Sequence, residues 1–137
     1  MLVVDASATV AMLLEETEQV VSPDTFDILT EKELIVPSHW PAEVGNALLV
    51  NVRRGRLSPD RLSAIVERLN IFRFQVQQPP QPDEIVDRLK GALTNGLTYY
   101  DALYVQLAVE QRATLFSLDR QMRRVAKAIG INVLPDM

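Results

Sequence analysis

Four acidic residues spread along the chain could together hold a divalent cation: Asp5, Glu43, Asp101 and Asp119. Carboxylate oxygens are the hard ligands that Mg²⁺ and Mn²⁺ take. Two unit charges about 4 Å apart cost on the order of 4 kcal/mol at an intermediate dielectric, so convergence of these side chains requires a cation among them. The first question is therefore whether the fold brings them together.

The elements that must position these acids alternate between strands and helices. Short apolar runs predict strands, and helical spacing with proline or capping residues at the start predicts helices. The predicted strands are 2–4, 34–36, 72–76, 114–118 and 131–134; the predicted helices are 6–15, 23–31, 41–54, 59–69, 85–95, 99–112 and 120–129. This alternation predicts a three-layer α/β/α sandwich around a central, mainly parallel sheet, with helices on both faces.

Parallel sheets place the carboxyl ends of their strands at one edge, where ligands collect. Asp5 and Asp119 each follow a predicted strand directly, and Glu43 opens the helix that comes after the strand 34–36. All three are expected at this edge. For Asp101 the rule gives no answer, because its helix is preceded by another helix.

A purely structural explanation exists for each acid, since negative charge near a helix N-terminus stabilises the helix. Asp5 and Asp119 could be simple N-caps, and Thr98 with Asp101 has the spacing of a capping box. From spacing alone, the structural and catalytic readings both stay open.

Composition limits the other possibilities. The 137 residues contain no cysteine and one histidine, His39, so any metal must be bound mainly by oxygen. The net charge of −4 argues against broad electrostatic attraction to nucleic acid, and any such contact must be local. No apolar run is long enough to span a bilayer, and no signal peptide precedes the first predicted strand, so we expect a soluble cytoplasmic protein without membrane association.

Four separated motifs resemble, in order and context, those of PIN domains, and in particular of VapC-type toxins of type II toxin-antitoxin systems. They are Val3-Val4-Asp5-Ala6-Ser7, Glu43-Val44-Gly45-Asn46, Thr98-Tyr99-Tyr100-Asp101-Ala102 and Ser117-Leu118-Asp119. The resemblance covers essentially the whole chain, so residues 1–137 are expected to form a single PIN domain.

This resemblance implies that the four acids are catalytic and bind Mg²⁺ or Mn²⁺. The expected activity is metal-dependent endoribonuclease hydrolysis of RNA phosphodiester bonds, leaving 3′-hydroxyl and 5′-phosphate ends. A bound ion would activate a water and neutralise charge on the phosphate. Small polar residues near the acids are expected to support the carboxylates or contact substrate: Ser7, Asn46, Thr98 and Ser117.

Basic clusters provide candidate phosphate contacts. One contains Arg53, Arg54 and Arg56; the second contains Arg120, Arg123, Arg124 and Lys127. We favour the second, and Arg120 within it, because positive charge near a helix start has no stabilising explanation. His39 is predicted to cap or pack rather than to join the site, and the tyrosines at 99, 100 and 104 to be mainly structural.

Partners follow from the resemblance: an RNA substrate, a cognate antitoxin protein that blocks the site, and a second copy of the chain in a homodimer. The alternative is a non-catalytic PIN-like module that only binds a partner protein. Metal affinity would separate the two.

Overall fold

The computed structural model describes residues 1–14 and 22–136. Its elements are β1 (Leu2–Val4), α1 (Ala6–Leu13), α3 (Pro23–Glu31), β2 (Glu33–Val36), α4 (Trp40–Arg53), η1 (Pro59–Arg61), α5 (Leu62–Glu67), η2 (Arg68–Ile71), β3 (Arg73–Val76), α6 (Pro82–Asn95), α7 (Tyr99–Gln111), β4 (Thr114–Phe116), α8 (Arg120–Ala128) and β5 (Val133–Leu134), where η denotes a 3-10 helix. None of the helices in this described part is long and apolar enough to cross a membrane.

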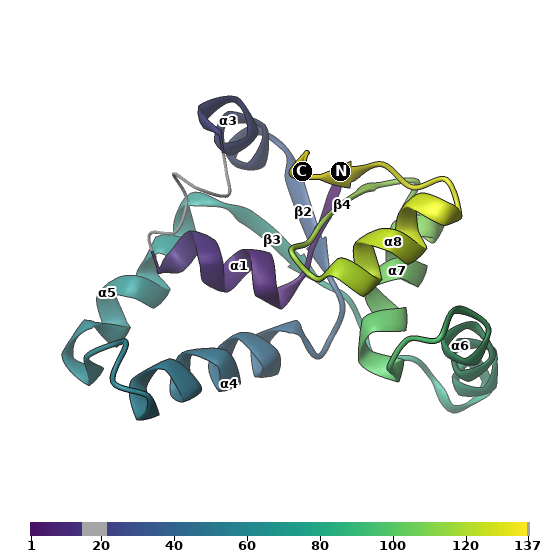
Figure 1. The fold of residues 1–137 in the computed structure, drawn as a ribbon, viewed down its shortest axis with the longest axis horizontal. Coiled ribbons are helices and arrows are strands. Elements are labelled where there is room, and N and C mark those ends of the chain that lie inside the picture. The colour runs from purple at the N-terminus through teal and green to yellow at the C-terminus, as the bar shows by residue number, and fades with distance from the viewer. Residues whose placement is uncertain (15–21, 137) are drawn as a thin grey trace.

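The strands form one sheet in the order β3-β2-β1-β4-β5, and every ladder is parallel (Figure 1). The central strand β1 pairs with β2 on one side and β4 on the other, with Leu2 opposite Leu34 and Thr114. The predicted α/β class with a mainly parallel sheet is confirmed. This order places the carboxyl ends of β1 and β4 side by side, where Asp5 and Asp119 follow.

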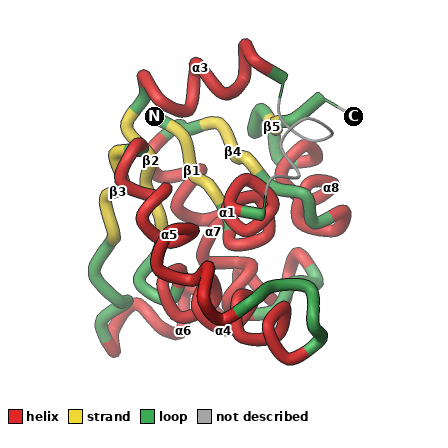
Figure 2. The backbone as a smooth tube through the Cα atoms, turned by 90° about the vertical axis from the view of Figure 1, so that its left-hand side faces the viewer, coloured by secondary structure: helices red, strands yellow, loops and turns green. Residues whose placement is uncertain are grey.

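Helices cover both faces of the sheet, as Figure 2 shows. Because side chains alternate along a strand, Val3 packs on one face with α4 and α7, whereas Leu2 and Val4 pack on the other with α1 and with Leu29 of α3. Burial of these strand residues is nearly complete. The three-layer arrangement therefore follows from short, continuous apolar strands that are buried on both faces.

Some boundaries differ from those predicted. The region predicted as one helix over 59–69 is η1, α5 and η2 in succession, and β4 ends at Phe116 rather than at residue 118. The strand stops because the next residues turn into the cap of α8: the backbone N–H of Asp119 donates to the Ser117 hydroxyl at 3.1 Å. The predicted end of the first helix, at Glu15, lies outside the described residues.

Candidate active site

Asp5 lies at the junction of β1 and α1, and its side chain is enclosed by donors. The carboxylate Oδ1 accepts from the Ala8 backbone N–H at 2.9 Å and from the Ser7 hydroxyl at 2.8 Å, and Oδ2 accepts from the Ser117 hydroxyl. Asp5 is therefore the N-cap of α1, as the structural reading predicted. A simple cap is normally exposed to water, however, and Asp5 is only 3% exposed.

Burial raises the pKa of Asp5 to about 6 from an ordinary value of 3.8. The hydrogen bonds from Ser117, Ala8 and Ser7 oppose this effect, and the charge of Asp119 adds to it. The surroundings of Asp5 thus disfavour its ionised form although several donors point at it. Desolvation of the Asp5 carboxylate therefore outweighs its hydrogen bonds.

Ser117 connects Asp5 to Asp119. The Ser117 hydroxyl donates to Asp5 and accepts from the backbone N–H of Asp119, while the Asp119 carboxylate caps α8 by accepting from Met122 N–H at 2.8 Å. Ser117 is fully buried at the end of β4. The two aspartates that follow β1 and β4 are therefore held next to each other through one serine hydroxyl.

Asp101 and Glu43 approach the same edge from α7 and α4. Burial raises the pKa of Asp101, the charges of Asp119 and Glu43 raise it further, and a hydrogen bond from the Thr98 hydroxyl acts in the opposite direction. The Thr98 hydroxyl also caps α7 by accepting from the Asp101 backbone N–H at 3.1 Å. Asp101 therefore lies within electrostatic reach of both Asp119 and Glu43.

The four acidic side chains do not form a closed set of metal ligands in this structure. Within 1–14 and 22–136, no three His, Cys, Asp or Glu side chains come close enough to hold an ion by ligating it together. The donor set still fits Mg²⁺ or Mn²⁺. Such ions retain several waters and bind through one or two carboxylates plus substrate phosphates, and a cation near Asp5 would offset the burial of its carboxylate.

Two residues that the sequence interpretation left out of the site contact Glu43. The buried Tyr104 hydroxyl donates to Glu43 Oε1 at 2.7 Å, and His39 Nε2 lies 3.3 Å from the same oxygen. Neither ring nitrogen of His39 has a well-aligned hydrogen-bond partner among the described residues, and burial lowers the pKa of His39 while Glu43 opposes this. The i, i+4 spacing of His39 and Glu43 was the only available sequence signal for this contact.

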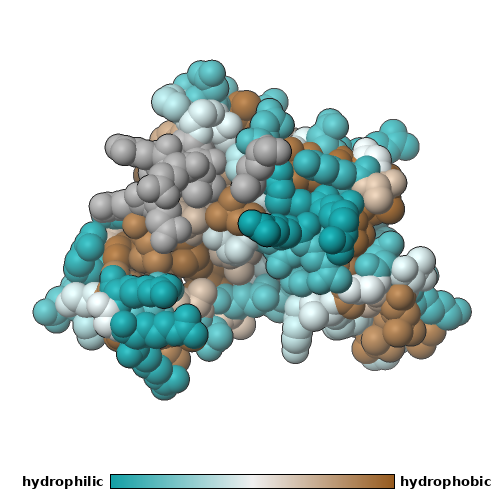
Figure 3. Space-filling model, in the orientation of Figure 1, coloured by the Kyte–Doolittle hydropathy of each residue, from teal (hydrophilic) through white to brown (hydrophobic). Residues whose placement is uncertain are grey.

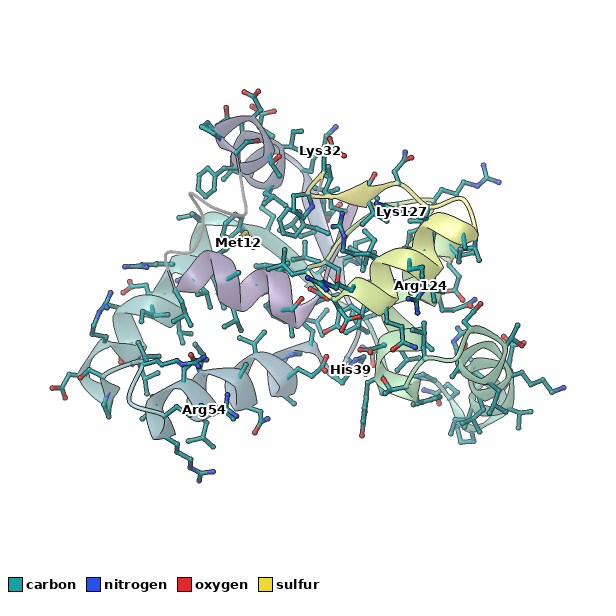
Figure 4. All side chains as sticks on the ribbon, viewed as in Figure 1. Met12, Lys32, His39, Arg54, Arg124 and Lys127 are labelled. Carbon is teal, nitrogen blue, oxygen red and sulfur yellow. The ribbon has the colours of Figure 1, made fainter. Side chains whose placement is uncertain are left out.

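Figure 4 shows His39 where α4 begins, beside α7, with Arg54 near the opposite end of α4. The start of α4 is fixed by a buried bridge to α1: Trp40 Nε1 donates to the Thr9 hydroxyl at 3.0 Å, and this hydroxyl donates to the Asp5 carbonyl at 2.8 Å. The same bridge therefore sets the position of the helix bearing Glu43 relative to the backbone of Asp5.

A cleft of about 440 Å³ runs from the site between α1 and α4. Ser7, Glu43, Asn46 and Arg56 contribute polar groups to it, and the rest of its lining is mostly apolar. Asn46, predicted to support Glu43 or contact substrate, lies on this cleft one helical turn beyond Glu43. Of the arginine cluster at the end of α4, Arg56 faces the cleft.

Only some of the basic side chains of helix α8 are exposed to solvent. Arg120, Arg124 and Lys127 are exposed, and hydrophilic side chains cover this part of the molecule in Figure 3. Arg123 is 6% exposed and donates to the backbone carbonyls of Ser117 at 2.8 Å and Pro135 at 2.6 Å. The inclusion of Arg123 in a phosphate-contacting patch was therefore wrong: its guanidinium satisfies two buried carbonyls.

Comparison with known proteins gives consistent matches. Residues 2–128 match the model of the PIN domain family. The chain is 35% identical over 126 residues to ribonuclease VapC3 of Pyrobaculum aerophilum, covering 88% of this chain and 91% of that protein. It is 33% identical over 93 residues to exonuclease VapC9 of the same organism, covering 67% of each. The crystal structure of PAE2754 from that organism superposes with a TM-score of 0.68 at 27% identity, over 96% of this chain and 89% of that one.

Proposed function

Because this chain belongs to the PIN domain family, we propose that it is an Mg²⁺- or Mn²⁺-dependent endoribonuclease that acts as the toxin of a toxin-antitoxin pair. One observation supports this most. Asp5 is buried, its pKa is raised to about 6 mainly by that burial, and the charge of Asp119, another carboxylate, raises it further. A divalent cation would remove this penalty, and the relatives are named as nucleases.

In this proposal the four acids hold the ion and its waters: Asp5, Glu43, Asp101 and Asp119. When bound, the ion supplies an activated water and neutralises charge on the scissile phosphate. Ser7 and Ser117 keep the Asp5 carboxylate oriented through their hydroxyl groups. Thr98 fixes the first turn of α7 and thereby the position of Asp101.

Substrate contact is assigned to the polar groups around the acids. Asn46 and Arg56 line the cleft that leads away from Glu43 and Ser7, and Arg120 is exposed at the first position of α8, directly after Asp119. These groups can bind phosphate and ribose oxygens of single-stranded RNA. The contacts are local, which agrees with the net charge of −4.

The proposed partners are a cognate antitoxin that covers the site and a second copy of the chain. The α1–α4 cleft is lined mostly by apolar residues and includes Glu43, which suits a protein segment that would exclude RNA. For self-association, α6 offers an apolar stripe that contains Ile85, Val86, Leu89 and Leu93, visible as the hydrophobic area over α6 in Figure 3. We also propose a cytoplasmic location and a single domain over 1–137.

The competing proposal is a PIN-like module that binds a partner without catalysis. One observation favours it: among the described residues, no three acidic or histidine side chains are close enough to ligate one ion together. It predicts no metal affinity, whereas the ribonuclease proposal requires it.

The test is cleavage of a mixed single-stranded RNA pool by the purified chain with Mn²⁺, with EDTA, and with the Asp101→Asn variant. Asp60→Asn, an exposed acid on η1, is the matched control. The proposal expects cutting by wild type and Asp60→Asn, and none by Asp101→Asn or with EDTA. Equal cutting by all variants would identify a contaminant, and no cutting together with no Mn²⁺ binding would establish the binding module.

A further inference from the structure

Glu43 differs from the aspartates of the site because it has a long side chain on a partly exposed helix surface. Its side chain is 36% exposed, and three rotatable bonds separate its carboxylate from the backbone. Without support, this carboxylate would sample many positions. A hydroxyl group on α7 restricts it, and a histidine ring at the start of α4 lies against the same oxygen.

Tyr104 supplies this hydroxyl group. Its side chain is almost fully buried, with the residue 1% exposed, and its hydroxyl donates to Glu43 Oε1 at 2.7 Å. The rigid ring leaves the hydroxyl little freedom, because only two torsions move a tyrosine and this one is packed in the core with Val105 and Ala108. The position of Oε1 is therefore tied to the framework of α7.

His39, the residue before α4, lies against the same carboxylate without a well-aligned hydrogen bond to it. Its Nε2 is 3.3 Å from the same Oε1 atom. Its ring packs edge-on against Tyr104 at 5.0 Å and tilted against Tyr100 at 5.2 Å between centroids. The histidine ring therefore packs beside the Tyr104–Glu43 contact, and the hydrogen bond to Oε1 comes from Tyr104 alone among the described residues.

We propose that Tyr104 is a positioning residue that holds Glu43 Oε1, so that Glu43 offers only its other oxygen, Oε2, to a divalent cation. This rests on the proposed metal-dependent function. Asp101 precedes Tyr104 by three residues on the same helix, so α7 both provides one acid of the site and orients another. Glu43 is then a ligand through a single oxygen, which leaves room for water and a phosphate on the ion.

The same contact could serve only the fold, because the buried Tyr104 hydroxyl needs a hydrogen-bond acceptor and Glu43 provides one. The two accounts differ in what happens to metal binding. If Glu43 only satisfies Tyr104, loss of the hydroxyl changes stability and leaves metal affinity unchanged. If Tyr104 orients Glu43, its loss weakens metal binding, and only when Glu43 is present to be oriented.

The experiment measures the Mn²⁺ dissociation constant of the full chain by electron paramagnetic resonance, for wild type, Tyr104→Phe, Glu43→Gln and the double variant. Tyr99→Phe, a half-buried tyrosine on the same helix, is the control. Tyr104→Phe is expected to weaken Mn²⁺ binding about tenfold or more, the usual effect of removing a group that orients a ligand. It should also lower kcat for RNA and leave KM unchanged. Tyr99→Phe should behave as wild type.

The double variant decides how Tyr104 acts. A group that works through Glu43 has no further effect once Glu43 is replaced, so Glu43→Gln and the double variant should bind Mn²⁺ equally. An unchanged dissociation constant in Tyr104→Phe overturns the proposal, as does the same loss in both backgrounds. Thermal unfolding confirms that each variant is folded at the temperature of measurement.

The outcome also separates this proposal from the ribonuclease activity. A wild type that binds Mn²⁺ but cuts no RNA overturns the activity alone, and the affinities still decide the role of Tyr104. A wild type that binds no Mn²⁺ overturns both.

Discussion

At the scale of single residues, the burial of Asp5 opposes the ionisation that a metal ligand needs. Three hydrogen-bond donors surround its carboxylate, yet its pKa is raised, because the effect of burial on the pKa is larger than that of the three hydrogen bonds. An unfolded chain would expose the same side chain to water. Keeping Asp5 ionised at neutral pH therefore costs the metal-free fold on the order of 2–3 kcal/mol.

Replacement of Asp5 by asparagine should stabilise the metal-free protein while abolishing cleavage. The asparagine side chain is expected to keep an acceptor for Ala8 and Ser7 and to lose the buried charge. In EDTA at pH 7.5, denaturant unfolding should show Asp5→Asn more stable than wild type by about 1–3 kcal/mol. Asp27→Asn, at an exposed position of α3, should change little. A destabilised Asp5→Asn would show that Asp5 acts mainly as a helix cap.

The pH dependence of the free energy of unfolding of the wild type provides a second measure of the cost of ionising Asp5. The folded pKa of Asp5, about 6, lies above its ordinary value of 3.8, so the folded state binds the proton more readily than the unfolded state. The contribution of Asp5 to stability should therefore improve as pH falls from above 6 towards 4. Subtracting the Asp5→Asn profile from that of wild type isolates it, and a difference that is flat over this range would contradict the assignment.

What the sequence could indicate at this scale depended on local context. Asp5 and Asp119 were predicted at the sheet edge because each directly follows a strand. Their roles as caps were equally visible. The contact between Tyr104 and Glu43 was not predictable, because it joins residues on α7 and α4 that meet only through the tertiary fold.

At the scale of elements, the path of the chain explains why Asp101 reaches the site. β3 ends at the carboxyl edge, and β4 must begin at the opposite edge because the two strands run in parallel. The chain therefore has to cross the sheet between them, and α7, which packs on β1 and β4, makes this crossing. Its N-terminus, with Asp101, then lies at the carboxyl edge.

The sequence did not show that Asp101 reaches the carboxyl edge, because α6 lies between β3 and α7. No local sequence feature indicates which of these two successive helices returns the chain to the other edge of the sheet. Strand positions were more predictable than strand ends. The buried runs of β1 and β2 are apolar and sharply bounded, whereas β4 and β5 are shorter than predicted because their flanking residues join caps and turns. Arg123 was misread for a related reason: a charged residue on a polar helix was assumed to face water.

Arg123 should be the most important of the α8 cations for stability. It donates to the carbonyls of Ser117 and Pro135 from a buried position. Arg123→Met keeps much of the side-chain volume and leaves both carbonyls without this donor, so denaturant unfolding should show a loss on the order of 3 kcal/mol. The neighbouring Arg124 is exposed, and Arg124→Met should lie within about 0.5 kcal/mol of wild type. Equal losses of stability in the two variants would contradict a stabilising role for the two hydrogen bonds of Arg123.

At the scale of the whole molecule, the apolar stripe on α6 is a candidate interface with another protein chain. Leu93 is 82% exposed and Val86 is 58% exposed, on a helix whose opposite side packs on α7. Exposed apolar residues at helical spacing are typical of protein interfaces rather than of free surfaces.

Self-association of the purified chain should therefore depend on this stripe. Sedimentation velocity should show a dimer for wild type and a monomer, or a much weaker dimer, for Leu93→Glu, because the introduced charges would be buried against each other. Val66→Glu, at an exposed apolar position on α5, is the control and should remain dimeric. A monomeric wild type, or a dimer unaffected by Leu93→Glu, would remove α6 as the proposed interface.

The central claim is that the acids at one edge of the sheet form a metal site that hydrolyses RNA. The most direct test is the single-turnover cleavage rate as a function of Mn²⁺ concentration, for wild type and Asp119→Asn. Asp119 is the appropriate position because its charge acts on both Asp5 and Asp101. We expect a saturating, EDTA-sensitive rate for wild type and a loss of at least about 100-fold for Asp119→Asn. Cleavage that is independent of Mn²⁺, or equal in the two proteins, would contradict the account.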